Sequence, residues 1–173
     1  MSCRRARHRR TRGPCRHEGA GALSGCLVCG APRPDARLED ATARGVTLVC
    51  APAGFGKTTV LGEWARSSRR RVAWLSLDSG DSDPARFRRY VAAALDGHAS
   101  GIAQHVGALL RGPQQPSVEA VIISVINEAA GLDGEVVLVL DNYHLTDGAA
   151  VHDSVALLLE RLPQQVRLMC SPV

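Results

Sequence analysis

The chain has 173 residues, of which 45% are apolar and only 3% aromatic, and its formal net charge is +4. This length suits one domain with a core of aliphatic side chains. No apolar run approaches the roughly 20 residues that a membrane-spanning helix needs, and the charged N-terminus has no secretory signal, so we expect a cytoplasmic protein with no membrane partner.

The positive charge is concentrated at the start of the chain. Residues 1–17 contain seven Arg and no acidic residue, whereas the remaining residues contain 14 basic and 17 acidic side chains. Residues 1–40 have neither helical nor strand periodicity and are expected to form a disordered, basic, Cys-rich leader. The alternative is an arm that attracts nucleic acid.

A zinc site is a second possibility for the leader. Cys26 and Cys29 have the C-x-x-C spacing of zinc ligands. Further ligands could come from Cys3, His8, Cys15 and His17. These residues lack a regular spacing, so incidental cysteine is the preferred interpretation.

We expect an ordered domain over residues 44–173. Alternating apolar runs and capping residues predict its elements. The expected strands are Val46–Cys50, Val72–Leu77, Val136–Leu140 and Val166–Cys170, and the expected helices are Thr58–Ser67, Pro84–Leu95, Ser117–Ala130 and Ala149–Leu162, with a short helical piece near Ile102–Leu110. This order predicts an α/β fold with a parallel sheet covered by helices on both faces.

A phosphate-binding loop lies between the first strand and the first helix. Residues 51–59 read Ala-Pro-Ala-Gly-Phe-Gly-Lys-Thr-Thr. They match the P-loop pattern G-x-x-x-x-G-K-[ST], except that Ala51 replaces the first Gly. Lys57 is the only lysine of the chain. The expected nucleotide-binding residues are Ala53, Gly54, Phe55, Gly56, Lys57, Thr58 and Thr59.

An acidic residue at the end of another strand completes the predicted site. Asp141 follows the most apolar strand and is expected to hold Mg²⁺ together with the Thr58 hydroxyl. Asn142 comes next; its amide can hydrogen-bond a water but cannot take its proton, so at most slow ATP hydrolysis is expected. His144 is a polar candidate nearby, although a structural loop residue is the preferred interpretation.

The succession of motifs resembles the MalT-like, large ATP-binding LuxR-type transcriptional regulators, which are signal-transduction ATPases with numerous domains. The residues that carry the resemblance are 51–59, Trp64, Ala73–Asp78, Asp83–Phe87, Leu138–His144 and Leu162–Pro163. The resemblance implies an ATP/ADP switch, self-association promoted by ATP, and DNA binding by a C-terminal helix-turn-helix domain absent from this chain.

The chain departs from that family after its last strand. The family usually has Ser-Arg there, whereas Ser171 is followed by Pro172. We therefore expect a P-loop fold that is incomplete at its C-terminal end, a fragment or truncated relative, with one sheet edge unpaired.

Two alternatives stay open. One is a small P-loop kinase or phosphotransferase, and the other is a zinc- or nucleic-acid-binding leader on a degenerate ATPase fold. Arg69–Arg71 and the helical residues Arg86, Arg88 and Arg89 are compatible with a nucleic-acid face, but a solvated surface is the preferred interpretation.

Overall fold

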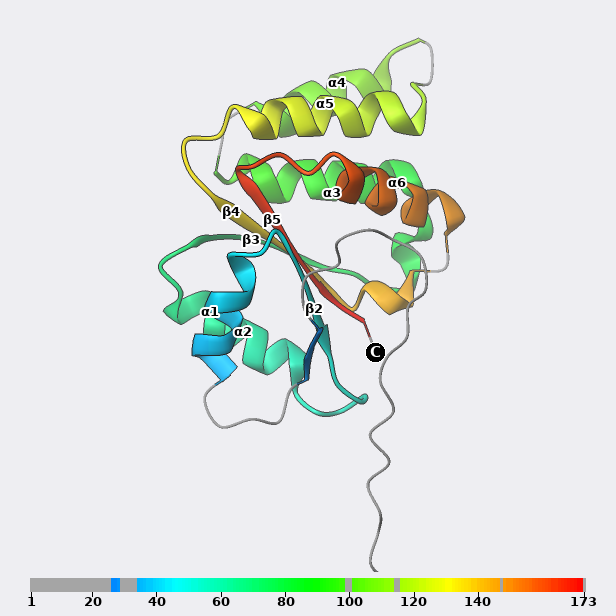
Figure 1. Cartoon of the computed structure of the whole chain (residues 1–173). Helices are drawn as coiled ribbons and strands as arrows, with labels where there is room; N and C mark the ends of the chain where they lie inside the picture. Colours follow the sequence, from blue (N-terminus) through cyan, green and yellow to red (C-terminus); the bar gives the residue numbers. More distant parts are fainter. Residues whose placement is uncertain (1–25, 29–33, 99–100, 114–115, 147, 173) are drawn as a thin grey trace, which may run out of the picture.

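A parallel sheet forms the centre of the molecule (Figure 1). The computed structural model describes residues 26–28, 34–98, 101–113, 116–146 and 148–172. Across the sheet the strands are β1 (Cys26–Val28), β2 (Val46–Cys50), β5 (Val166–Ser171), β4 (Val136–Asp141) and β3 (Arg71–Ser76). Each neighbouring pair is parallel, as the alternation of strands and helices predicts.

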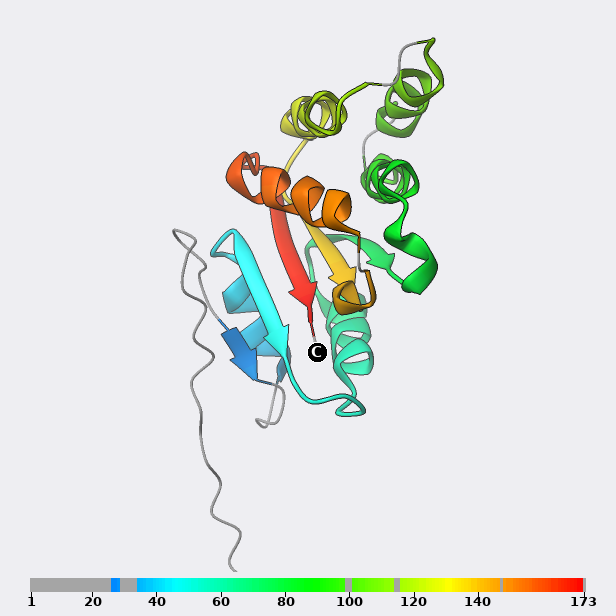
Figure 2. The ribbon, with the colours of Figure 1, turned by 90° about the vertical axis from the view of Figure 1, so that its right-hand side faces the viewer.

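Helices cover both faces of this sheet. One face carries α1 (Pro34–Thr42) and α2 (Lys57–Ser67); the other carries α3 (Pro84–Asp96), α4 (Ile102–Arg111), α5 (Val118–Ala130) and α6 (Ala149–Glu160). In Figure 1, α3 and α6 lie between the sheet and the α4–α5 pair, and Figure 2 shows α1 and α2 on the opposite face. The predicted layers are confirmed.

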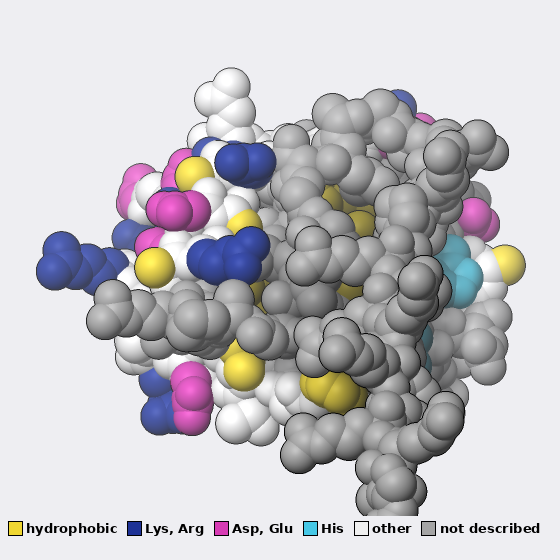
Figure 3. Space-filling view, turned by 60° about the horizontal axis from the view of Figure 1, so that its bottom comes forward, with side chains coloured by type: hydrophobic (Ala, Val, Ile, Leu, Met, Phe, Trp, Pro, Cys, Tyr) yellow, Lys and Arg dark blue, Asp and Glu magenta, His cyan; other side chains and the backbone are white. Residues whose placement is uncertain are grey.

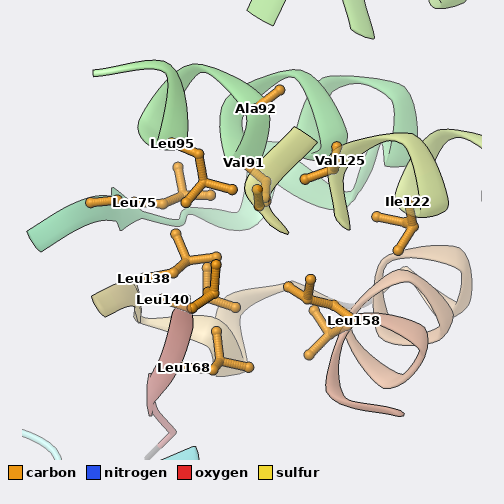
Figure 4. Close-up of a cluster of buried hydrophobic side chains, with 14 of the residues drawn as sticks. Leu75, Val91, Ala92, Leu95, Ile122, Val125, Leu138, Leu140, Leu158 and Leu168 are labelled. Carbon is orange, nitrogen blue, oxygen red and sulfur yellow. The ribbon is translucent and has the colours of Figure 1, made fainter. Parts of the chain in front are cut away.

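Strand β4 separates two hydrophobic cores. All six of its residues are buried, as expected for a strand covered on both faces. Leu138 and Leu140 point toward the α3–α6 side and pack with residues such as Val91 and Leu158 (Figure 4). Val137 and Val139 belong to the cluster on the α1–α2 side. The strand is therefore held by apolar contacts from both layers.

The folded part begins earlier than the sequence indicates. The expected disordered leader covers residues 1–40, yet α1 and β1 lie largely within it. Leu38 is buried on α1 and joins the cluster formed by Leu61 and Trp64 of α2. Ala41 and Thr42 of the same helix are buried too, so α1 is docked although its sequence periodicity is weak. The other leader residues, including four of the proposed zinc ligands and Cys29, lie outside the described ranges.

A cluster of polar contacts, which we call the Glu39 clamp, fixes α1 to the core. The Glu39 carboxylate accepts hydrogen bonds from Trp64 Nε1 at 3.0 Å, Ser68 Oγ at 2.9 Å and Arg70 Nε at 3.0 Å. Arg70 also contacts Glu135 at 2.7 Å. Burial alone raises the pKa of Glu39, but these hydrogen bonds outweigh it and lower the pKa.

The sheet edge beside the P-loop strand is also occupied. The sequence predicts one unpaired sheet edge without saying which one. In the structure Cys26, Leu27 and Val28 pair in parallel with Leu48, Val49 and Cys50. A three-residue apolar run within the expected leader therefore supplies a strand beside β2.

None of the helices described is long and apolar enough to cross a bilayer.

The sequence predicts a solvated surface for the arginines of α3, but Arg88 is buried there, with 5% of its surface exposed. Burial lowers the pKa of its guanidinium, and the negative charge of Asp83 opposes that shift. This arginine therefore does not belong to an exposed basic face.

The start of α6 packs without spare room against the 3₁₀ turn η1 (Ser79–Ser82). A Cβ on Gly148 would lie 2.6 Å from the carbonyl oxygen of Ser82. We expect Gly148→Ala to lower the free energy of unfolding by about 1–3 kcal/mol, because backbone must shift to relieve the overlap. Urea unfolding measures this change.

Gly62, within α2, is the matched control, because a Cβ there would meet no atom within 4 Å. Gly62→Ala should raise stability by up to about 1 kcal/mol through helix propensity. Equal stability of Gly148→Ala and the unsubstituted chain would contradict the tight packing.

Candidate functional site

The loop between β2 and α2 has the backbone shape of an anion cradle. Gly54 and Gly56 have φ values of 78° and 73°, in the left-handed region that favours glycine. No side chain caps the start of α2, and its first turn has no acidic residue. The free N–H groups and the positive end of the helix dipole are therefore available to a negatively charged ligand.

Lys57 lies at the first position of α2 with its side chain folded into the loop. Only 9% of its surface is exposed, and its Nζ donates to the carbonyl oxygen of Ala51 at 2.7 Å. A second carbonyl oxygen, that of Pro52, lies at 3.5 Å. The ammonium group is thus held by two neutral acceptors, which a phosphate oxygen can replace with a stronger charge-assisted bond.

A cavity of about 360 Å³ opens over this loop. The lining residues are Ala53, Gly54, Phe55, Gly56, Lys57, Thr58, Asn142 and His144. Six of the seven residues predicted to bind nucleotide line the cavity, and Thr59 is exposed one position further along α2. The structure also brings Asn142 and His144 to the same cavity from the turn after β4.

Phe55 is the most exposed large apolar side chain among the described residues, with 65% of its surface accessible. Phe55 lines the cavity. Its backbone N–H already donates to the carbonyl oxygen of Pro52 at 3.3 Å. Its backbone therefore contributes less to an anion cradle than those of its neighbours.

Asp141 ends β4 fully buried, without a hydrogen-bond partner for either carboxylate oxygen in the part of the chain that is described. It lies in register between Ser76 of β3 and Ser171 of β5. The Ser171 hydroxyl is also buried and has no described partner. Polar atoms are rarely buried unsatisfied, so the carboxyl ends of β4 and β5 leave oxygen atoms available to a further ligand.

These groups fit magnesium better than a protein-only metal site. Mg²⁺ prefers oxygen ligands and is usually bound by one or two carboxylates together with phosphates and water. Asp141 supplies a carboxylate, and Thr58 an exposed hydroxyl on the cavity wall. No group of three or more potential His, Cys, Asp or Glu ligands occurs within the described ranges.

The turn that follows Asp141 has contacts that the sequence alone did not indicate. Asn142 adopts a left-handed conformation with φ of 59°, and η2 (Tyr143–Leu145) follows it. The Tyr143 hydroxyl lies 2.6 Å from Nδ1 of His152 on α6. A spacing of nine residues across a loop gives no recognisable pattern, so His152 could be found only from the structure.

Charges are distributed unevenly over the face seen from below in Figure 1. Figure 3 shows most of the visible Lys, Arg, Asp and Glu side chains on one side of this face, and histidine side chains together with a few charged ones on the other. His144 lines the cavity from η2, and His152 lies on α6, where it contacts Tyr143.

Comparison with known proteins gives a consistent result. A model of the AAA domain matches residues 40–169. The chain is 33% identical over 124 residues to the HTH-type transcriptional regulator MalT of Yersinia enterocolitica, covering 72% of this chain and 14% of that protein. The MalT proteins of Yersinia pestis and Yersinia pseudotuberculosis are each 32% identical over 133 residues, covering 77% of this chain and 15% of theirs.

The chain thus spans about one seventh of the length of these curated relatives. The AAA match agrees with the P-loop α/β fold predicted from the sequence, and the likeness to MalT agrees with the motifs that carried the resemblance. Neither comparison favours the small-kinase alternative.

The unsatisfied carboxylate of Asp141 should destabilise the fold when no cation is bound. We expect Asp141→Asn to raise the free energy of unfolding in EDTA by about 1 kcal/mol or more, because the substitution removes a buried charge and keeps the shape. Urea unfolding measures this, with Asp153→Asn, at an exposed position of α6, as the control that should change little. Lower stability of Asp141→Asn would contradict the idea.

Proposed function

We propose that this chain, which belongs to the AAA domain family, binds ATP with magnesium. It would act as the nucleotide-binding module of a MalT-like transcriptional regulator. One observation carries the proposal: the uncapped start of α2 and Lys57, the only lysine of the chain, line one cavity together with Asn142. Asn142 directly follows the buried Asp141, whose carboxylate has no partner among the described residues. A phosphate bound with a cation would engage the free N–H groups, the ammonium and this carboxylate.

Phosphate recognition would be carried by the loop backbone and Lys57. The N–H groups at Ala53, Gly54 and Gly56 and at the first turn of α2 would donate to phosphate oxygens. The Lys57 ammonium would leave the carbonyl oxygen of Ala51, 2.7 Å away, for a phosphate oxygen. The exchange is favourable because an ion pair in a partly buried site is stronger than a bond to a neutral carbonyl.

Magnesium would be held by Thr58 through its hydroxyl and by Asp141 through its carboxylate. When bound, the ion supplies positive charge that neutralises phosphate oxygens. The burial of Asp141 supports this role, because a cation would give its two oxygens the partner that the described residues do not provide.

Asn142 favours a switch over a rapid ATPase. It lines the cavity directly after Asp141, where a general base for the attacking water is usually needed. An amide positions water but does not accept its proton, so ATP would persist long enough to define one state of the module. ADP would define the other.

The functions of the rest of a MalT-like regulator are proposals that go beyond this chain. They are self-association in the ATP state and binding of DNA through a helix-turn-helix domain outside the 173 residues. A cytoplasmic location follows from the same role. None of them depends on a zinc site in the leader.

Loss of the lysine should abolish tight nucleotide binding. We expect Lys57→Ala to weaken binding of Mg-ATP by about 30-fold or more, since it removes a charge-assisted hydrogen bond to phosphate. Isothermal titration calorimetry on the full chain measures this. Arg66→Ala removes an exposed positive charge from the last turn of the same helix and should change the affinity less than about twofold. Equal affinities of Lys57→Ala and the unsubstituted chain would refute the proposed site.

Restoring a carboxylate after Asp141 should speed hydrolysis. Asp tolerates the left-handed backbone of Asn142 almost as well as Asn does. We expect Asn142→Asp to raise the rate of phosphate release from Mg-ATP by about tenfold or more, because the new group can accept a proton from water. A coupled phosphate-release assay measures the rate, and no acceleration with unchanged ATP affinity would show that the residue does not limit hydrolysis.

A further inference from the structure

The turn η2 joins the cavity to the helical layer through two different sets of side chains. Asn142 and His144 line the cavity. Tyr143, between them, packs against the core cluster of the α3–α6 side. Its hydroxyl is 2.6 Å from His152 Nδ1, and the two rings meet edge to face with centroids 5.3 Å apart. Alternate residues of one short turn therefore contact the cavity and α6.

Backbone hydrogen bonds make this turn a rigid unit. The Leu145 N–H donates to the carbonyl oxygen of Asn142 at 2.9 Å. The carbonyl oxygen of Tyr143 accepts from Thr146 twice, from the hydroxyl at 2.8 Å and from the N–H at 3.3 Å. Thr146 is itself buried, with 2% of its surface exposed. A displacement of His144 or Asn142 must therefore move Tyr143 as well.

The Tyr143–His152 hydrogen bond forms with either tautomer of the imidazole. A phenol hydroxyl both donates and accepts, so it can donate to Nδ1 or accept from an Nδ1–H. The contact is short and Tyr143 is half-buried, and the geometry holds the two side chains together.

Helix α6 is in turn firmly seated. Val151, Val155 and Leu158 are buried in the large core cluster. At its start, Gly148 packs so closely on Ser82 that a Cβ would overlap the carbonyl oxygen of that residue. The internal hydrogen bonds of η2 hold one side of the Tyr143–His152 contact, and the packing of α6 holds the other.

We propose that Tyr143 is a positioning residue whose hydrogen bond to His152 fixes η2 against α6 and so sets Asn142 and His144 at the nucleotide cavity. This inference rests on the proposed function, since it assigns a regulatory contact to the same site. Because coupling between two sites is reciprocal, a nucleotide that engages η2 must also stabilise α6. The helical layer would then report the state of the cavity to the rest of a larger protein.

The terminal phosphate should be the part of the nucleotide that η2 detects. In P-loop proteins the loop backbone cradles the inner phosphates, and its lysine reaches the terminal one. Among the described residues, Asn142 and His144 are the two cavity-lining residues that do not belong to the loop, so they are the groups left to meet a phosphate that extends beyond it. ATP and ADP should therefore differ in their effect on α6.

The first test compares two tyrosines by calorimetry on the full chain. We expect Tyr143→Phe to weaken binding of Mg-ATP by about threefold to tenfold, as loss of one hydrogen bond allows, and to change Mg-ADP affinity less than about twofold. Tyr90→Phe is the matched control, because its hydroxyl bonds Arg86 Nε at 2.9 Å on the exposed side of α3. It should alter neither affinity.

The second test measures hydrogen exchange of the α6 amides. In the unsubstituted chain, saturating Mg-ATP should slow exchange across residues 149–160 more than saturating Mg-ADP does. That difference should vanish in Tyr143→Phe and His152→Ala. It should return in part in His152→Asn, whose amide oxygen offers an acceptor near the position of Nδ1.

The outcomes separate this inference from the proposed function. Failure of the unsubstituted chain to bind Mg-ATP overturns both. Normal binding that is lost in Lys57→Ala supports the site. If α6 exchange is then the same with Mg-ATP and Mg-ADP, or if Tyr143→Phe keeps both the affinity and the exchange difference, the positioning role alone is overturned. The exchange comparison in the unsubstituted chain decides the matter even if a variant fails to fold.

Discussion

The burial of the Asp141 carboxylate, for which the described residues provide no partner, is the constraint on which the rest of the structure depends. Strand β4 is enclosed on both faces, so its end delivers the side chain into a region with no solvent to satisfy it. A cation at that point restores the balance. The apolar contacts of Val137, Leu138 and Leu140 provide the stability that permits such a charge to be buried at all.

The loop before α2 presents the complementary arrangement. There the unused groups are donors: the N–H groups at the start of an uncapped helix and an ammonium bonded only to carbonyl oxygens. The donors of this loop line the cavity, and the carboxylate of Asp141 lies buried directly before Asn142, which lines the same cavity. A magnesium–phosphate ligand would match both sets of groups.

Much of this arrangement could be predicted from the sequence. The pattern around Lys57 and the apolar strand ending in Asp141 are local signals, and the alternation of strands and helices determines the parallel sheet. The contacts of Glu39 with α2 and of Tyr143 with His152 join residues whose spacing has no periodicity, so they emerge only from packing. Arg88 illustrates the same limit, because charge alone indicates solvent and tertiary contacts bury it.

The pairing of β1 with β2 has a consequence for the order of folding during synthesis. Strand β2 must wait for β5, whose Leu168 is paired with Val46 and leaves the ribosome last among the strands. Strand β1 and helix α1 are synthesised before β2. Among the described strand pairs, β1 and β2 join residues that are closest in sequence, so their pairing is the most local. Strand β1 and helix α1 can shield one edge of the P-loop strand from other nascent chains throughout that interval.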